Sequence, residues 1–238
     1  MAKKAAKKAS KKTAKKTAKK GAKKASAKKI SPNAAIPIAT DVPKPPKDPA
    51  IVELGSQKVA VVTTKGDPNV VLQDVMPALY GAAYTLKFDL KKKNPGGETF
   101  KVMALRGRWP DAHEKPKNEW TGILALPVPE DTVVLPQKVP EVEVKLDTWQ
   151  YGTCACVLHI GPYTEEASNI ERLHKFIVDS GYVFNGVHEE WYLTRPNAKI
   201  QKTLLLHPIR KAANEEELDT FRKGIVGFWN NATSHASQ

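Results

Sequence analysis

Glu190 stands in an alternating run with His188 and Tyr192 that could bring a carboxyl, an imidazole and a phenol together. Successive side chains of a β-strand point to opposite faces, so these three share one face if residues 187–193 form a strand. A carboxyl buried among apolar groups can hold a cationic ligand. It can also act as a general acid or base once burial has raised its pKa. The plainer alternative is a solvated glutamate on an exposed face.

Aromatic side chains are the second candidate set, because they offer flat apolar walls and, in tyrosine, hydroxyl donors. Each of them alone could equally be a core residue, whereas several together can line a pocket. The set comprises Tyr80, Tyr84, Trp109, Trp120, Tyr163, Trp191 and Tyr192.

Metal and cofactor chemistry find little support. His159 and His188 lack the acidic or cysteine partners at ligand spacing that a metal site needs. No phosphate-binding loop, dinucleotide glycine pattern, nucleophile elbow or zinc-finger spacing occurs, so we predict no cofactor and no metal. Cys154 and Cys156 alternate on a predicted strand and fit a reduced, cytosolic compartment. No apolar run has the length of about 20 residues that a membrane span needs.

The elements that must position these residues occur twice in the order strand, helix, strand, strand. The first series is a β-branched strand at 59–63 that ends at a turn signal at 66–69, a helix capped by Asp74, and strands at 100–109 and 120–126. The second is a strand at 149–160, a helix capped by Thr164 and ended by Gly181, and strands at 187–193 and 203–207.

We therefore predict an α+β fold in which tandem β-α-β-β modules form a pseudo-two-fold antiparallel-sheet domain with a central cleft. The two halves share negligible sequence identity, so the repeat rests on element order alone. Residues 136–144 are expected to be a short helical or irregular stretch. A last helix should open at Asn214, with Glu217 in capping-box position, and dock its apolar stripe on the domain or on a partner.

The positive charge is confined to the N-terminus. The net charge is +13, and residues 1–29 hold fourteen lysines and no acid, which leaves 13 − 14 = −1 for residues 30–238. This tail is expected to be disordered by itself and to bind DNA non-specifically, with an acidic membrane surface as the alternative. Its lysines are Lys3, Lys4, Lys7, Lys8, Lys11, Lys12, Lys15, Lys16, Lys19, Lys20, Lys23, Lys24, Lys28 and Lys29. Residues 30–56 follow as a proline-rich linker.

Four phrases together resemble the GyrI-like small-molecule-binding family across residues 57–208, leaving residues 209–238 as an added C-terminal helix and tail. The lysine- and alanine-rich tail resembles those of linker histones and some bacterial nucleoid proteins. The phrases are Gly66-Asp-Pro-Asn69, Leu79-Tyr-Gly-Ala-Ala-Tyr-Thr-Leu-Lys-Phe88, His159-Ile-Gly-Pro-Tyr-Thr-Glu-Glu166 and Glu190-Trp-Tyr-Leu-Thr-Arg-Pro196.

The resemblance implies ligands held in a cleft between the modules, as in multidrug-binding effector domains, with Glu190 pointing into it. Some members are similar to hydrolases that open the cyclopropane of DNA-alkylating compounds. The chain departs from the family in a short segment between residues 69 and 79, in its added last helix, and in Arg106, which stands where an acid is common. Arg106 is expected to bring a cation near the cleft.

The leading prediction is a binding module for small aromatic or apolar molecules, cationic or DNA-damaging ones included, with the tail holding DNA in the cytoplasm near the nucleoid. One alternative is a hydrolase in which Glu190 works with Tyr84 or Tyr163 on a strained ring. A second is an architectural or topoisomerase-inhibiting protein that acts through its tail. The predicted ligand contacts are Tyr80, Trp109, Trp120, Glu190 and Tyr192.

Overall fold

A computed structural model of the chain describes residues 44–97, 99–112 and 115–235, with side chains up to residue 229. Its first half contains β1 (Ala50–Leu54), β2 (Gln57–Lys65), α1 (Pro68–Lys93), β3 (Leu105–Arg108), a short 3-10 helix η1 (Lys117–Glu119) and β4 (Thr121–Pro127). Its second half contains β5 (Lys145–Trp149), β6 (Gly152–Ile160), η2 (Tyr163–Glu165), α2 (Ala167–Asp179), β7 (Tyr182–Phe184), β8 (Glu189–Tyr192), β9 (Lys202–Lys211) and α3 (Glu215–His235).

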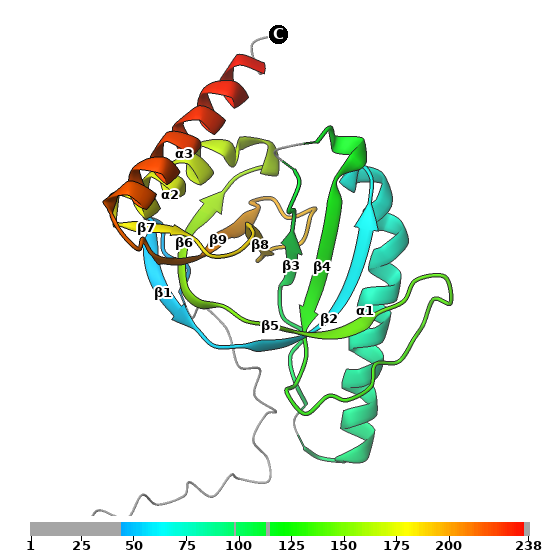
Figure 1. Cartoon of the computed structure of the whole chain (residues 1–238). Coiled ribbons are helices and arrows are strands. Elements are labelled where there is room, and N and C mark those ends of the chain that lie inside the picture. The colour runs from blue at the N-terminus through cyan, green and yellow to red at the C-terminus, as the bar shows by residue number, and fades with distance from the viewer. Residues whose placement is uncertain (1–43, 98, 113–114, 236–238) are drawn as a thin grey trace, which may run out of the picture. The chain divides into compact units, whose positions relative to one another are not determined.

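The strands form an antiparallel sheet in the order β1-β6-β9-β8-β3-β4-β2-β5, with β7 added on β9 (Figure 1). This order is symmetric about the boundary between β8 and β3. On one side lie β8, β9 and β6, and on the other lie their counterparts β3, β4 and β2. The predicted α+β fold of two β-α-β-β modules is confirmed.

Two short strands exchange places between the modules. Strand β1 leads into β2 but pairs with β6, and β5 leads into β6 but pairs with β2. Each module is therefore closed by a strand that precedes the other, which ties the halves together. Two expectations change as a result. Strand β1 lies inside residues 30–56, predicted as linker, and the strand predicted at 149–160 is broken by Gly152, whose φ of 66° suits glycine.

Helix α1 begins earlier than predicted. The backbone N–H of Asn69 donates to the Asp67 carboxylate at 2.8 Å, so Asp67 caps the helix and Pro68 occupies its first turn. The prediction that Asp74 is the cap is wrong. Residues 66–69, predicted only as a turn at the end of the strand, also contain the start of the helix. Pro77 therefore lies inside the helix, where it cannot donate to the carbonyl one turn earlier.

Two other boundaries also differ. Thr164 does not cap α2: it lies in η2, and α2 follows Glu166 without a side-chain cap. The strand predicted at 100–109 is shorter than expected, because only β3 (Leu105–Arg108) forms within it. The stretch 136–144 is irregular, one of the two forms expected for it.

Both long helices of the modules pack on one face of the sheet. Core residues of β2 and β4 contact α1, and core residues of β6 and β9 contact α2. The opposite face has its own core, which contains Trp149, Tyr151 and Trp191. Helix α3 docks on the domain through Leu218, as one of the two expected alternatives stated.

The predicted cap of α3 is confirmed. The Glu217 N–H donates to Asn214 Oδ1 at 2.9 Å, and the Glu217 carboxylate accepts from Ala213 N–H. In the part of the chain that the structure describes, no helix is long and apolar enough to cross a membrane.

Candidate functional site

Glu190 lies at the centre of a row of residues that crosses the helix-covered face of the sheet. It pairs with Gly107 of β3 on one side and with Leu205 of β9 on the other. Because paired residues project to the same face, the row shows which face Glu190 occupies. From α1 to α2 it reads Val62, Leu124, Gly107, Glu190, Leu205 and Val157. The carboxyl thus stands between the two helices, and the residue is 7% exposed.

Two glycines on this face make room for the rings beside Glu190. A Cβ on Gly107 would lie 3.0 Å from the Tyr192 hydroxyl and 3.1 Å from Trp109 Nε1, and one on Gly122 would lie 2.9 Å from the Trp109 ring. The Trp109 indole N–H donates to the Tyr192 hydroxyl at 3.1 Å. Burial, followed by the charge of Glu190, holds the pKa of Tyr192 well above its usual value, so this phenol stays protonated.

Of the seven aromatic residues in the predicted set, most gather at this place, but Tyr84 does not, and Trp191 lies on the opposite face of the sheet. Tyr163 meets Tyr192 edge-on with ring centroids 5.5 Å apart, and Trp109 lies 6.1 Å from Trp120. Tyr80 packs against the core cluster that contains Trp109. Tyr84 is 44% exposed and stacks on Tyr80 at 6.3 Å, and none of the described contacts joins it to Glu190.

The loop between β3 and β4 holds Trp120 in place. The Asp111 carboxylate accepts from the Thr121 N–H at 2.7 Å and from Lys115 Nζ at 2.8 Å. The Lys115 bond, followed by the Thr121 bond, keeps the pKa of Asp111 well below its usual range. Trp120 itself donates its indole N–H to the Lys115 carbonyl, and its own carbonyl accepts from Gly66 at the start of α1.

A second carboxyl, Glu166, belongs to this site although we did not single it out from the sequence. Its Oε2 is buried, and no described group hydrogen-bonds to it. Burial, followed by the charge of Glu190, raises the pKa of Glu166 to about 8. The site therefore pairs a carboxyl that is protonated at neutral pH with Glu190. The doubled glutamate of the phrase 159–166 was the available signal, but alternation could not tell which of the two turns inward.

His159 fixes the turn that carries Glu166. The ring is buried, with Nε2 3.0 Å from the Pro162 carbonyl and Nδ1 3.0 Å from the Asn169 side-chain amide. Both ring nitrogens are thus used to join the end of β6 to the start of α2. This explains its place in the family phrase as a structural one. Among the described residues, no group of three or more histidine, cysteine or acidic side chains is arranged to hold a metal ion.

Replacing Glu166 by glutamine should abolish a fall in stability between about pH 4.5 and pH 8. In the folded chain the carboxyl keeps its proton to about pH 8, whereas in the unfolded chain it ionises near 4.5. Folding stability due to this group is therefore full below pH 4.5 and is lost as pH rises towards 8. We expect a loss on the order of 2 kcal/mol, about half of what the full shift would give, because the side chain is partly exposed.

Urea denaturation at several pH values measures this loss, with Glu165→Gln as the matched control because Glu165 is exposed. An equal loss between about pH 4.5 and pH 8 in the wild type and in Glu166→Gln would contradict the prediction.

Arg106 does not bring a cation to this face, so that expectation is wrong. Gly107 faces Glu190, and the neighbouring Arg106 therefore points to the opposite side of the sheet. There it is 2% exposed, donates to the Tyr151 hydroxyl at 2.7 Å and lies 4.0 Å from the centroid of the Trp191 ring. Arg106, which departs from the family pattern, is therefore part of the core on the face opposite Glu190. The face that carries Glu190 receives no positive charge from it.

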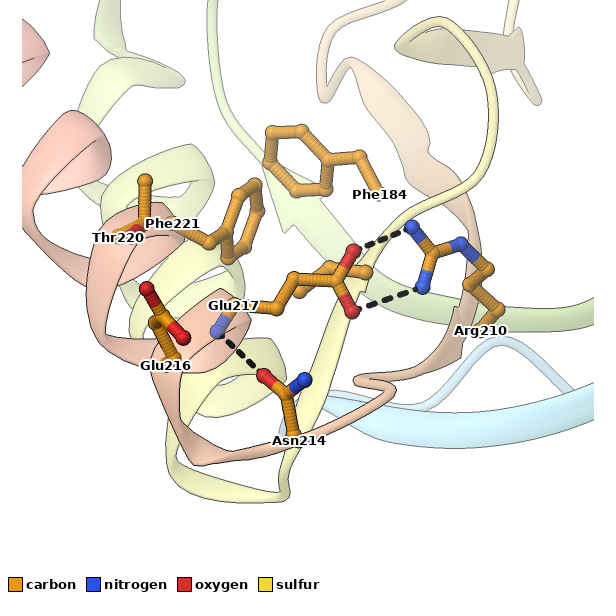
Figure 2. Close-up of a pocket in the computed structure, with 8 residues that line it drawn as sticks. Phe184, Arg210, Asn214, Glu216, Glu217, Thr220 and Phe221 are labelled. Carbon is orange, nitrogen blue, oxygen red and sulfur yellow. Dashed lines mark hydrogen bonds and ion pairs between the residues drawn. The ribbon is translucent and has the colours of Figure 1, made fainter.

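Two surface hollows lie away from Glu190. One, of about 490 Å³, lies between β7, β9 and α3. There the Arg210 guanidinium donates two hydrogen bonds to the Glu217 carboxylate, at 2.6 and 3.1 Å (Figure 2). Its charged centre is thus already paired, and the pKa of Glu217 is lowered to about 2 by the Arg210 bond. The other, of about 240 Å³, lies beside Lys58 and Asp147.

Comparison with known proteins agrees with this fold. The family of GyrI-like small molecule binding domains matches residues 47–210. A crystal structure of a hydrolase from Listeria innocua is similar at 24% identity, with a TM-score of 0.58 over 71% of this chain and 94% of that chain. An uncharacterized conserved protein from the same organism is similar at 24% identity, with a TM-score of 0.60 over 70% and 94%.

No curated protein is similar enough to count as a match. The fourteen predicted DNA-binding lysines lie outside the described residues. The match covers well over half of the chain and spans both modules, the exchanged strands and Glu190. The chain therefore belongs to the family of GyrI-like small molecule binding domains.

Proposed function

We propose that the face around Glu190 binds a small aromatic or apolar molecule and favours one with a positive charge. The single observation that carries this is a buried carboxyl among aromatic rings, in a family of small-molecule-binding domains. In a medium of low polarity, an anion attracts a cation more strongly than it does in water. Ring faces add to this attraction.

Tyr163 is the ring of this site that is best placed to move aside for a ligand. It lies in the short η2 turn, is half-buried, and covers Tyr192 edge-on. Swinging this ring outward opens the side of Glu190 without disturbing the sheet. We therefore expect an aromatic guest to take the place of the Tyr163 ring against Tyr192.

Replacing Glu190 by glutamine should weaken binding of ethidium, a planar permanent cation, by at least about tenfold, which corresponds to about 1.4 kcal/mol. The amide keeps the shape of the carboxylate but not its charge. Fluorescence titration at neutral pH measures the dissociation constant, with Glu165→Gln as the control. The proposal fails if the wild type does not bind ethidium, or if the two variants bind it equally well.

A second candidate is hydrolysis of a strained or reactive small molecule at the same place. Two carboxyls whose pKa values differ suit an acid and a base, and Glu166 is the one that keeps its proton at neutral pH. Glu166 would protonate the substrate while Glu190 activates a water, with Tyr163 or Tyr192 as a donor. Ring opening of a cyclopropane-bearing alkylator, followed by mass spectrometry, tests this, and a rate no faster than that in buffer excludes it.

We further propose that the N-terminal lysine segment holds DNA without regard to sequence. Fourteen lysines and no acid in residues 1–29 suit phosphate binding by counterion release, while the remainder of the chain is nearly neutral. The two parts together would keep a captured or destroyed DNA-damaging molecule close to the chromosome, in the cytoplasm at the nucleoid.

A further inference from the structure

Behind Glu190 stands a connected group of three histidines, which we call the histidine chain: His188, His207 and His174. His207 Nε2 lies 3.1 Å from His188 Nδ1 and 3.0 Å from His174 Nε2. The outer nitrogen of His188, Nε2, lies 3.5 Å from Glu190 Oε1. The three rings come from separate elements, the segment before β8, strand β9 and helix α2. They are therefore brought together only by the fold.

The inner rings of the histidine chain hold His188 in its orientation. His207 stacks on Phe184 with centroids 4.2 Å apart and planes 6° from parallel. His174 packs against the same phenylalanine at 4.8 Å. This stacking fixes the plane of the His207 ring, and within that plane its Nε2 lies next to both His188 and His174. His188 in turn must present Nε2 to Glu190.

The ring hydrogens of the histidine chain can be arranged in two ways, and each sets what His188 Nε2 presents to Glu190 Oε1 at 3.5 Å. If His207 Nε2 accepts, His188 carries its hydrogen on Nδ1. The unprotonated Nε2 of His188 and the Glu190 carboxylate would then be two acceptors facing each other. This is avoided only if His188 takes a second proton or Glu190 is protonated. If His207 Nε2 donates, the neutral His188 carries its hydrogen on Nε2 and donates to Glu190. In the first case the pair is neutral, and in the second it carries one negative charge.

We propose that His188 controls whether Glu190 can bind a cationic ligand. Binding of the cation then strengthens as pH rises through the range in which histidines lose their protons. The inference rests on the proposed function of Glu190. Protonated His188 neutralises the carboxylate and repels a cation, whereas neutral His188 only orients it. Histidine is the side chain whose charge ordinarily changes between about pH 5 and 8.

The other ionisable groups around this pair fit the same direction. Tyr163 from η2 and Tyr192 from β8 have pKa values raised by burial and remain neutral. Glu166, next to α2, becomes negative only above about pH 8 and then adds to the attraction for a cation. Gly107 of β3 contributes no charge, and the neighbouring Arg106 and Arg108 face the opposite side of the sheet. Two separate steps in cation binding are therefore expected.

Ethidium titrations between about pH 5.5 and 9 test the proposal, with neutral anthracenemethanol as the uncharged probe. Wild-type affinity for ethidium should rise about tenfold between pH 5.5 and 7.5, and anthracenemethanol should show no such step. His188→Gln keeps a donor towards Glu190 but cannot become charged, so it should remove the lower step. Glu166→Gln should keep the lower step and remove the rise near pH 8. A lower step that persists in His188→Gln, or is missing in the wild type, overturns the inference.

A measurement without ligand separates this inference from the proposed function. The ring-nitrogen NMR shifts of His188 should change in Glu190→Gln and stay the same in Glu165→Gln, because only Glu190 shares the proton. Unchanged shifts in Glu190→Gln overturn the inference even if ethidium binds. Changed shifts with no ethidium binding at any pH leave the His188 pairing intact and reject the binding function instead.

Discussion

Glu189→Gln should lower the free energy of unfolding by about 3–5 kcal/mol, the largest loss of stability that we expect from a single substitution in this domain. Glu189 is fully buried on the face of the sheet opposite Glu190. Its carboxylate accepts from Arg108 Nε at 2.8 Å, from the Tyr151 hydroxyl at 2.7 Å and from the Trp191 indole at 2.6 Å. Neutralising it leaves the Arg108 guanidinium, whose side chain is 17% exposed, without its counter-charge.

The adjacent Glu190→Gln is the natural control because it makes the same change one residue away on the other face. Glu190 pairs with no arginine in the described contacts, so we expect its replacement to change stability by less than about 1 kcal/mol. Urea denaturation followed by tryptophan fluorescence gives both values. Equal losses in the two variants would mean that the carboxyls do not divide between stability and binding in this way.

Removing the positive partner as well should recover part of the loss. In Glu189→Gln with Arg108→Met, the uncompensated guanidinium is gone, and the methionine can fill the place of Arg108 over the Trp149 ring, where the guanidinium now lies 3.6 Å from the centroid. A double variant as unstable as the sum of the two single variants would instead show that the carboxyl and the guanidinium act independently.

Strand alternation was enough to place Glu190, but not the charges around it. The alternation correctly put His188, Glu190 and Tyr192 on one face, because that inference needs only local geometry. The error at Arg106 came from the pairing of β3 with β8, which sets Gly107 opposite Glu190 and turns the arginines away. Such a register joins residues more than eighty positions apart. No local pattern records it.

The same limit explains the other differences. The order of the modules could be predicted, since each contains long periodic segments. The exchanged strands β1 and β5 are only five residues each, and their pairing depends on the finished sheet. Glu166 and the histidine chain are likewise products of packing, since His174, His188 and His207 carry no recognisable spacing. The sequence could name Glu190 and the rings beside it, but not Glu166 and the two inner histidines that pack next to them.

Deleting residues 2–29 should reduce affinity for mixed-sequence duplex DNA by at least about a hundredfold at low salt. Under the proposed DNA binding, the full chain brings fourteen lysines to the phosphates, whereas residues 30–238 carry a net charge of −1. If most lysines engage, the slope of log affinity against log salt should approach about −10 in the full chain and fall close to zero in the truncated one. Fluorescence anisotropy at several salt concentrations measures both slopes.

Two further variants decide what the lysines do and whether the domain matters. Shuffling the order of residues 2–29 should preserve DNA affinity, because counterion release depends on charge and not on sequence, while changing all fourteen lysines to glutamine should match the deletion. Ethidium binding by the truncated chain, measured without DNA, should equal that of the full chain if the domain works independently. If truncation removed every cellular effect while Glu190→Gln removed none, an architectural role of the tail would replace the two-part function. A loss in both would mean that the domain and the lysines serve one purpose, which is to bind a ligand where DNA is held.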